Sequence, residues 1–431
     1  MRDKGDLMID NIVIFEDLSY KNFYPLTLTR PVFELRCGIK SLVEKIVHLF
    51  PQAHFSLFSR NFLKAQLSYK YPNVPVNVLN TGGAVLLVNG RLIAGAESYP
   101  FFPDGEDRDF VLVKGKDIVF AYLRNENLNI IKPYITEEFR SLEIMKVLQK
   151  KVSFREIQAT LVEYPWDFIR LNQQQITNDF ISLKQSGVIK GCVHSRAVLY
   201  DEENMFIGKN TEVMAECVLD ARKGPIYIGE NVLIKSGSYI EGPSYIGDNA
   251  IVSKGYLREG SNIGKYCRVG GEIEETIFYE YSNKYHEGFV GHSYIGAWVN
   301  LGALTTTSDL KNNYSTVKIT HDNNVIDTGL QFMGSVIGDY TKFGIGSLLS
   351  TGSVFGIGCN LFGGGIFPRF VPDFIWGDNK NFEPHDIKKF ITTTDIVMKR
   401  RNISLSVQQE DALISVYNLT AESRNAFLAV R

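Results

Sequence analysis

A dipeptide of an aliphatic or aromatic residue followed by glycine recurs through the second half of the 431-residue chain, and it constrains the fold most strongly. It occurs at Ile207-Gly208, Ile228-Gly229, Ile246-Gly247, Ile263-Gly264, Val290-Gly291, Ile295-Gly296, Leu301-Gly302, Ile337-Gly338, Phe343-Gly344, Phe355-Gly356 and Ile357-Gly358. The steps between Ile228 and Ile263 are close to six residues or multiples of six. This hexapeptide period predicts a parallel β-helix, whose aliphatic side chains stack inward while glycine, Asn or Asp form the corners. We expect it over residues 188–377.

The first 180 residues follow a different pattern. Short β-branched runs at 11–15, 54–58, 75–79, 84–88 and 117–123 predict strands, and apolar residues at helical spacing over 36–50 and 61–69 predict helices. Strands that alternate with helices indicate a layered α/β domain. After residue 383 the character changes again, and we expect a tail of two helices over 387–401 and 406–417, within residues 383–431.

Composition excludes several classes of function. The hydrophobic fraction is 44% and the charged fraction 22%, which is typical of a globular protein with a sizeable core. A net charge of −2 argues against general binding of nucleic acid, and no window approaches 18 apolar residues, so we expect no membrane insertion. The five scattered cysteines predict reduced thiols, and the charged N-terminus lacks the pattern of a signal peptide, so we expect a cytoplasmic protein.

Polar residues after the strands of the first half are its candidate ligand contacts, because ligands of open α/β sheets bind beyond the carboxyl ends of strands. Arg30 and Lys40 lie close to an expected helix start and could hold a phosphate. Asn89 and Arg91 follow another strand in Val-Asn-Gly-Arg, and residues 164–172 lead into the second half. The alternative is a tight turn and surface ion pairs, and spacing alone does not decide between them.

The densest polar segment of the repeat region is residues 283–314. It contains two histidines, four asparagines, five serine or threonine hydroxyls and two lysines between glycines. The hexapeptide pattern is also lost at 271–287 and at 304–333, and loops that leave a rigid scaffold often carry function. We therefore expect a site in this segment.

Several motifs along the chain resemble one known family. They are Phe15-Glu-Asp17, Pro25-Leu-Thr-Leu-Thr-Arg-Pro31, Val88-Asn-Gly-Arg91, Trp166-Asp167, Tyr281-Ser-Asn-Lys284, Gly291-His-Ser-Tyr-Ile-Gly296 and Leu310-Lys-Asn-Asn-Tyr314. Together they resemble a divergent bacterial branch of the bifunctional N-acetylglucosamine-1-phosphate uridylyltransferase / glucosamine-1-phosphate N-acetyltransferase family. The resemblance implies an N-terminal nucleotidyltransferase-like α/β domain and a C-terminal left-handed β-helix. It also implies a homotrimer, with acetyl-CoA bound between neighbouring β-helices.

The resemblance also implies roles for residues of the β-helix. His286 falls where the family keeps the base that deprotonates the acceptor amine, and a histidine suits a base that works near neutral pH. Asn300 matches a sugar contact, Ala303 a backbone contact to acetyl-CoA, and backbone N–H groups around Gly302 and Ala303 are expected to bind the thioester oxygen. The remaining substrate contacts implied by the family are Arg258 for phosphate, Asn313, Tyr314 and Lys318.

The alternative for His286 is a polar loop residue, and its competitor His292 is expected to make a corner hydrogen bond. The chain also departs from the family around this site: a phosphate-binding lysine is replaced by Glu274, a tyrosine by Phe289, and a glycine by Leu304.

For the N-terminal half the resemblance implies uridylyl transfer from UTP to a sugar 1-phosphate, although the glycine-rich Gly-x-Gly-Thr-Arg start of the wider superfamily is absent. Such a displacement depends on positioning and on cations that neutralise the phosphates, usually with Mg²⁺. Arg30, Lys40 and Arg91 are the candidate cations, and Asp17 or Asp167 the candidate metal ligands. The alternative is that the arginines are structural and pinned by Glu34 or Asp17.

Three functions follow from these expectations. The first is a bifunctional enzyme that makes a UDP-linked N-acetylamino sugar for the cell envelope from a sugar 1-phosphate, UTP and acetyl-CoA. The second is an enzyme with one active half, either an acyltransferase or a nucleotidyltransferase with a trimerising β-helix. The third is a non-catalytic, sugar-binding trimeric scaffold.

Overall fold

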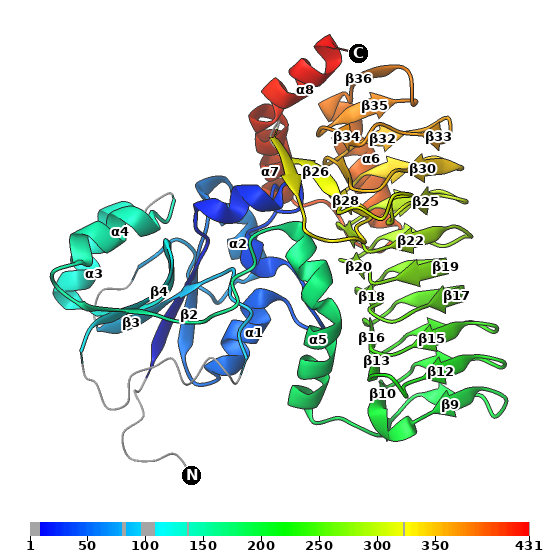
Figure 1. Cartoon of the computed structure of the whole chain (residues 1–431), viewed down its shortest axis with the longest axis horizontal. Coiled ribbons are helices and arrows are strands. Elements are labelled where there is room, and N and C mark those ends of the chain that lie inside the picture. Colours follow the sequence, from blue (N-terminus) through cyan, green and yellow to red (C-terminus); the bar gives the residue numbers. More distant parts are fainter. Residues whose placement is uncertain (1–8, 80–82, 96–107, 136–137, 322–323, 431) are drawn as a thin grey trace.

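An α/β domain, a β-helix and a helical tail make up the chain (Figure 1), as the sequence predicts. The computed structural model describes residues 9–79, 83–95, 108–135, 138–321 and 324–430. The α/β domain lies against one side of the β-helix, and the tail covers the upper end of the β-helix. None of the described helices is long and apolar enough to cross a membrane.

A mixed sheet forms the centre of the N-terminal domain, with strand order β2-β1-β3-β5-β4-β6. Strands β1, β2 and β3 are parallel, whereas β5 runs antiparallel to both β3 and β4. The strands are β1 (Asn11–Phe15), β2 (His54–Phe58), β3 (Ala84–Asn89), β4 (Phe110–Lys114), β5 (Asp117–Arg124) and β6 (Ser153–Glu156). The carboxyl ends of β1 and β3 lie side by side, so Asp17 and Arg91 follow neighbouring strands.

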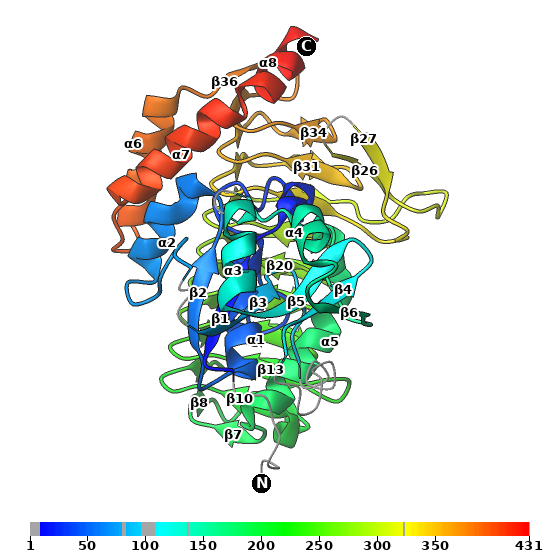
Figure 2. The ribbon, with the colours of Figure 1, turned by 90° about the vertical axis from the view of Figure 1, so that its left-hand side faces the viewer.

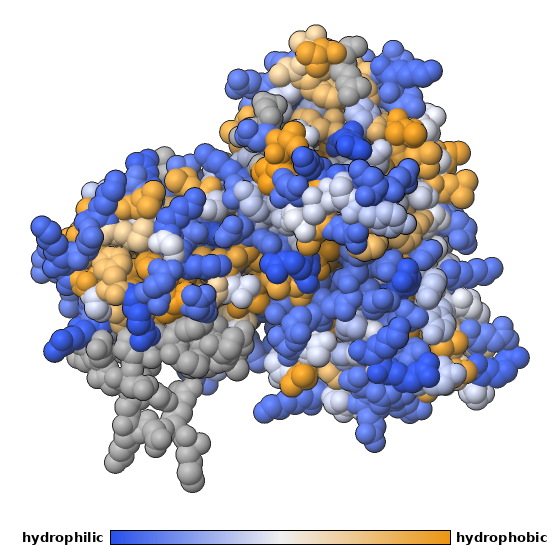
Figure 3. Space-filling view, viewed as in Figure 1, coloured by the Kyte–Doolittle hydropathy of each residue, from blue (hydrophilic) through white to orange (hydrophobic). Residues whose placement is uncertain are grey.

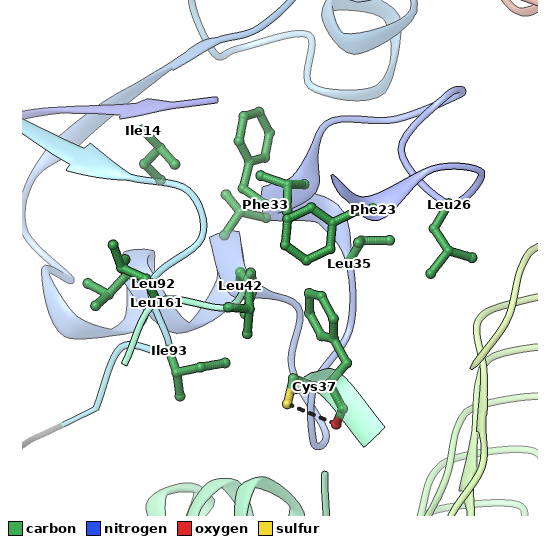
Figure 4. Close-up of a cluster of buried hydrophobic side chains, with 14 of the residues drawn as sticks. Ile14, Phe23, Leu26, Phe33, Leu35, Cys37, Leu42, Leu92, Ile93 and Leu161 are labelled. Atoms are coloured by element: carbon green, nitrogen blue, oxygen red, sulfur yellow. Dashed lines mark hydrogen bonds between the residues drawn. The ribbon is translucent and has the colours of Figure 1, made fainter. Parts of the chain in front are cut away.

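Both faces of this sheet are covered because alternate strand residues point to opposite sides. Val13 and Phe15 pack on the face covered by α3 and α4. Ile12 and Ile14 pack on the opposite face, in a large hydrophobic cluster of which Figure 4 shows a part. In that cluster the Cys37 thiol donates to the carbonyl of Phe168 on α5 at 3.7 Å. The helices are α1 (Leu42–Leu49), α2 (Lys64–Lys70), α3 (Asn125–Ile131), α4 (Ser141–Leu148) and α5 (Pro165–Leu183), with short 3₁₀ turns at Leu18–Phe23, Val32–Glu34, Asn61–Leu63 and Lys132–Tyr134.

Two elements of the N-terminal domain differ from the expectation. The helix predicted over 36–50 begins only at Leu42, because Ser41 forms a capping box with Glu44 and stops the helix at its N-terminus. The strand predicted over 75–79 is reduced to one bridge between Leu57 and Val76. Its apolar residues pack at the edge of the sheet without forming a ladder.

The β-helix has three sides, each a stack of short parallel strands. The first side is β7 (Val188–Ile189), β10 (Met205–Ile207), β13 (Ile226–Ile228), β16 (Ser244–Ile246), β18 (Asn262–Ile263), β20 (Ile277–Phe278), β23 (Tyr294–Ile295), β28 (Ser335–Ile337), β31 (Ser353–Phe355) and β34 (Phe370–Val371). The second is β8 (Cys192–Val193), β11 (Glu212–Val213), β14 (Leu233–Ile234), β17 (Ile251–Leu257), β19 (Arg268–Glu274), β21 (Asn283–Lys284), β24 (Asn300–Leu301), β29 (Lys342–Phe343), β32 (Asn360–Leu361) and β35 (Ile375–Gly377). The third is β9 (Val198–Tyr200), β12 (Val218–Asp220), β15 (Tyr239–Glu241), the ends of β17 and β19, β22 (Phe289–Gly291), β25 (Thr306–Thr307), β30 (Ser347–Leu349) and β33 (Gly365–Ile366).

The repeated dipeptide explains this stacking. Ile207, Ile228, Ile246 and Ile263 are in register on successive coils and fully buried, and burial of each such side chain contributes about 1.5–3 kcal/mol. The glycine that follows is required where coils approach closely: a Cβ on Gly264 would lie 1.5 Å from the carbonyl oxygen of Tyr279. The interruption expected at 271–287 is absent, because β19, β20 and β21 continue the coils, with the buried Lys284 at an inward position in register with Val269.

The excursion expected at 304–333 is present. After β25 it leaves the third side, forms the antiparallel pair β26 (Lys318–His321) and β27 (Asn324–Asp327), and returns at Phe332, which bridges to Leu310. Figure 2 shows this pair on one side of the β-helix and the tail helices on the other. The tail follows β36 (Phe382–Pro384) and consists of three helices, α6 (Ile387–Lys399), α7 (Val407–Leu419) and α8 (Ala421–Ala429), one more than predicted.

The N-terminal domain docks on the first side of the β-helix through buried hydrogen bonds. Arg30 and Thr29 both donate to the carboxylate of Asp339, which is almost fully buried. Asn172 of α5 donates to the carbonyl of Gly260 at 2.8 Å and accepts from Asn262 at 2.8 Å. Because each contact joins a polar group of one domain to a polar group of the other, the interface fixes their relative position.

Candidate functional site

Three of the N-terminal candidates, Asp17, Asn89 and Arg91, meet at the carboxyl ends of β1 and β3. Arg91 Nη2 donates to Asp17 Oδ2 at 2.7 Å and also pairs with Asp117 at 2.9 Å, while Asn89 Nδ2 donates to Asp17 Oδ2 at 2.9 Å. Arg91 is 1% exposed, and Asn89 and Asp17 are buried as well, at 0% and 3%. The three residues therefore form an interior network in which the charge of Arg91 is balanced by two carboxylates.

The other three N-terminal candidates lie elsewhere. Arg30 is paired with Asp339 of the β-helix and stacks over the ring of Tyr279 at 4.1 Å. The Asp167 carboxylate accepts the backbone N–H of Tyr164 at 3.1 Å, so it caps α5. Asp17 and Asp167 thus have separate partners, and neither belongs to the group of three potential cation ligands found among the described residues.

Lys40 lines a cavity. Its Nζ donates to Ser182 Oγ at 3.1 Å, and it lines a pocket of about 530 Å³ between α1 and α5 together with Lys45 and His48. Burial, opposed by Asp179 and reinforced by Lys45, lowers the pKa of Lys40. Lys45 is paired with Asp179 at 2.6 Å, so the pocket carries a modest excess of positive charge.

The β-helix candidates His286, Asn300, Gly302 and Ala303 converge on one pocket of about 660 Å³. The pocket lies on the second side and is closed by the end of α6. Its described lining is Arg268, Tyr281, Asn283, Tyr285, His286, Trp298, Asn300, Leu301, Gly302, Ala303, Lys342, Ile345, Val397, Arg400 and Arg401. No carboxylate is among these residues.

A buried lysine, Lys284, stabilises the loop that carries His286 through hydrogen bonds to backbone carbonyls. Lys284 is fully buried, and its ammonium donates to the carbonyl oxygens of His286 and of Gly270, the latter at 3.2 Å. Burial lowers the pKa of Lys284 to about 8. The imidazole of His286 is exposed to the pocket, with the Tyr285 ring edge-on at 5.6 Å. Lys284 therefore fixes the backbone of the loop and leaves the ring of His286 accessible.

The four other predicted contacts lie outside the lining of this pocket. Arg258 Nη1 donates to Glu274 Oε2 at 2.7 Å and lies 3.7 Å from Glu272, so the residue that replaces the expected lysine neutralises the expected phosphate-binding arginine. Asn313 and Tyr314 are exposed on the excursion, where Asn313 Oδ1 accepts the N–H of Ser315 at 3.2 Å. Lys318 lies in β26.

The competing histidine, His292, belongs to a second polar cluster at a corner between the third and first sides. Its Nδ1 lies 2.8 Å from Asp309 Oδ2, and the ring of Phe332 stacks on the imidazole at 5.1 Å. Glu274, His292 and Asp309 together form a group of potential cation ligands, whose ligand atoms all lie within 4.8 Å of one another. His292 thus makes the expected corner hydrogen bond, and it is absent from the lining of the pocket at His286.

Sequence reasoning missed the cations of the pocket. Strand pairing sets Arg268, Asn283, Asn300 and Lys342 next to one another on successive coils, so an alignment of the coils with each other would have found Arg268 and Lys342. Arg400 and Arg401 follow α6, and no periodicity in the tail shows that it folds back on the second side. Arg401 Nη2 donates to Asn283 Oδ1 at 3.0 Å and ties the tail to the pocket.

Comparison with known proteins places the N-terminal domain in a family. Residues 12–187 match the family model described as sugar nucleotidyl transferase. The chain is 24% identical over 239 residues to the bifunctional protein GlmU of Bartonella quintana (strain Toulouse), which covers 52% of this chain and 51% of that protein. It is 34% identical over 152 residues to a bifunctional sugar-1-phosphate nucleotidylyltransferase/acetyltransferase of Sulfurisphaera tokodaii, covering 35% and 38%. The chain thus spans about half or less of the length of these relatives.

Two solved structures are similar to parts of the chain. One is a putative glucose-1-phosphate thymidylyltransferase from Bacillus anthracis, with 13% identity and a TM-score of 0.29 over 39% of this chain and 96% of that one. The other is the UDP-N-acetylglucosamine O-acyltransferase LpxA from Moraxella catarrhalis RH4, with 14% identity and a TM-score of 0.18 over 55% and 95%. The N-terminal domain thus matches the sugar nucleotidyl transferase family model, and parts of the chain are similar at low identity to bifunctional sugar-1-phosphate nucleotidylyltransferase/acetyltransferases of the GlmU kind.

Proposed function

We propose that the protein transfers an acetyl group from acetyl-CoA to the amino group of a sugar, in the pocket at His286. The observation that carries this proposal is the convergence of His286, Asn300 and Ala303, from two coils, on a cavity of about 660 Å³. A histidine that reaches a polar pocket on a rigid scaffold is a suitable general base for an amine nucleophile. The names of the curated relatives support acetyl transfer.

In the proposed reaction the nitrogen of the acceptor amine bonds to the thioester carbonyl carbon, and His286 accepts a proton from that amine. The carbon–sulfur bond then breaks, and the CoA thiolate leaves with the proton from the imidazolium. The N–H of Gly302 already donates to the carbonyl of Phe343 at 3.0 Å, so we assign stabilisation of the oxyanion to the N–H of Ala303. Asn300, next to Asn283 on the adjacent coil, is the proposed contact to the sugar hydroxyls.

Nucleotidyl transfer from UTP to a sugar 1-phosphate is the second candidate activity, and together the two would give a UDP-linked N-acetylamino sugar. The match of residues 12–187 to the sugar nucleotidyl transferase family favours it. The two candidate metal ligands, Asp17 and Asp167, do not fit the binding of Mg²⁺. Asp17 is buried against Arg91 and Asn89, and Asp167 caps α5. Of the candidate cations, Lys40 reaches a pocket, and we propose that pocket for the sugar phosphate.

Self-association through the third side and its edge is part of the proposal. Leu304, Ile345, Leu348 and Ile366 are 60%, 73%, 43% and 65% exposed and stack on successive coils beside Ala303. Figure 3 shows hydrophobic side chains gathered at the edge of these upper coils. An apolar stripe next to the pocket supports a homotrimer with acetyl-CoA between copies. Sedimentation velocity tests it: Ile345→Lys should dissociate the oligomer, whereas Val407→Lys, an equally exposed site on α7, should not.

Two assays separate the activities. Thiol release from acetyl-CoA is followed with glucosamine 1-phosphate, unphosphorylated glucosamine and a nucleotide-linked amino sugar as acceptors. Pyrophosphate release is followed with N-acetylglucosamine 1-phosphate, UTP and Mg²⁺. Thiol release that is lost in His286→Gln supports the acyltransferase. If neither product forms with any acceptor, the protein is a non-catalytic, sugar-binding scaffold.

A further inference from the structure

Glu274, His292 and Asp309 come from three successive coils and meet at the corner between the third and first sides of the β-helix. Strand pairing sets Glu274 opposite Gly291, so His292 follows directly, and the N–H of His292 donates to the carbonyl of Glu274 at 3.0 Å. Asp309 follows β25 on the next coil, and its carbonyl accepts the N–H of Met333 at 2.8 Å. The stacked coils therefore hold the backbone of all three residues in place.

The side chains of these three residues converge. His292 Nδ1 lies 2.8 Å from Asp309 Oδ2, and the ligand atoms of all three lie within 4.8 Å of one another. A Cβ on Gly291 would lie 2.3 Å from Asp309 Oδ2, so the glycine leaves the space that this carboxylate occupies. The side chains of Glu274, His292 and Asp309 are 16%, 17% and 13% exposed. The cluster is thus compact, and an ion can still reach it from solvent.

Negative charge is in excess around this cluster. Arg258 Nη1 pairs with Glu274 at 2.7 Å, and the same guanidinium lies 3.7 Å from Glu272 and 4.0 Å from Glu259. One cation is therefore shared by three carboxylates, and Asp309 adds a fourth. Burial raises the pKa of Glu274, Arg258 opposes that rise, and repulsion from Glu259 and Asp309 adds to it. Carboxylates grouped in this way repel one another, and a cation that binds between them removes the repulsion.

We propose that Glu274, His292 and Asp309 bind one divalent transition metal ion of the Zn²⁺ or Mn²⁺ class. An imidazole nitrogen with two carboxylate oxygens suits such ions, whereas Mg²⁺ and Ca²⁺ take oxygen ligands. Ligand atoms lie about 2.0–2.2 Å from the ion and hence at most about 4.4 Å apart, so small side-chain rotations bring these three into range. Because a carboxylate has two oxygens, Glu274 can bind the ion and keep its hydrogen bond to Arg258, and such pairing is common around metal ligands.

An ion at this corner would join β19 and β22 to the start of the excursion at 304–333. Three protein ligands leave at least one coordination position open for water or for an anionic group of a ligand. The proposal is independent of acetyl transfer at His286, because Glu274, His292 and Asp309 lie outside the lining of that pocket.

The test is isothermal titration calorimetry of the full chain with Zn²⁺, Mn²⁺ and Mg²⁺, after a chelator has removed bound metal and has itself been dialysed away. The ligand variants are His292→Gln and Asp309→Asn, which stay close to the original side chains in size. The matched control is Glu272→Gln, which removes a carboxylate from the same guanidinium but lies outside the group of ligands. Circular dichroism confirms that each variant is folded.

We expect the wild type to bind Zn²⁺ or Mn²⁺ at a site that both ligand variants weaken about tenfold or more, because one of three ligands is lost. Glu272→Gln should bind nearly as the wild type does. Anomalous X-ray scattering from crystals grown with Zn²⁺ should place the ion between the three side chains.

Three results would overturn the proposal: no binding by the wild type, equal affinities in the wild type and both ligand variants, or an ion found only at other histidines. Loss of Mg²⁺ binding in the same variants would overturn the assignment to a transition metal.

Discussion

Replacement of Asp17 by alanine distinguishes a structural role of this carboxylate from a role as metal ligand. In the folded protein Asp17 accepts hydrogen bonds from Arg91, from Asn89 at 2.9 Å and from the N–H of Ser19 at 3.1 Å. Removal of one partner from a buried ion pair costs about 3–5 kcal/mol. Arg91 keeps Asp117 at 2.9 Å, so we expect about 2–4 kcal/mol.

Urea unfolding followed by circular dichroism measures this loss, and the double variant Asp17→Ala/Arg91→Met tests the coupling between the two residues. Because the two residues act as a pair, the double variant should be less destabilised than the sum of the single variants. Asp411→Ala, at an exposed position of α7, is the control and should be near neutral. An Asp17→Ala protein of wild-type stability that has lost Mg²⁺-dependent pyrophosphate release would refute the structural role.

Three further changes test other contacts. Arg30→Met removes the interdomain pair with Asp339, and we expect a loss of about 2–4 kcal/mol, seen as a lower Tm and faster proteolysis between the domains; unchanged digestion would contradict this. Burial raises the pKa of Glu275 from 4.5 to about 7, so the folded state binds more protons than the unfolded state and stability should fall as pH rises from about 4.5 to 7. Glu275→Gln should flatten that part of the stability profile, and an unchanged slope would contradict the assignment. Burial lowers the pKa of Lys342 to about 8, so the KM for an anionic substrate should rise above pH 8 in the wild type and not in Lys342→Met.

The sequence predicted the β-helix because its repeat is set by local geometry. Each Ile-Gly pair encodes one inward side chain and one close approach between coils, so the repeat could be found without knowledge of contacts distant in sequence. The α/β domain was predicted for the same reason, from strand and helix periodicities. The start of α1 differs from the prediction, because the capping box at Ser41 begins the helix six residues after the start of the apolar pattern at 36.

Pairings between distant residues could not be predicted in the same way. Arg30 lies 309 positions from Asp339, and Arg401 lies 118 positions from Asn283, and nothing local marks either residue as a partner. Arg91 is different. The sequence left two alternatives for it, a cation that binds phosphate or a structural arginine paired with Asp17 or Glu34, and the pair with Asp17 was therefore among the predictions. His286, Asn300 and Ala303 were named from the resemblance, and they share a pocket because the coils set them close together.

The most direct test of the account is acetyl transfer by the purified protein with and without His286. Thiol release from acetyl-CoA is measured for the wild type, for His286→Gln, and for His194→Gln, which changes an exposed histidine of the first coils. The account predicts that His286→Gln lowers kcat at least about a hundredfold, while His194→Gln leaves it unchanged. A His286→Gln enzyme that keeps the wild-type kcat would contradict the assignment of the base and of the pocket.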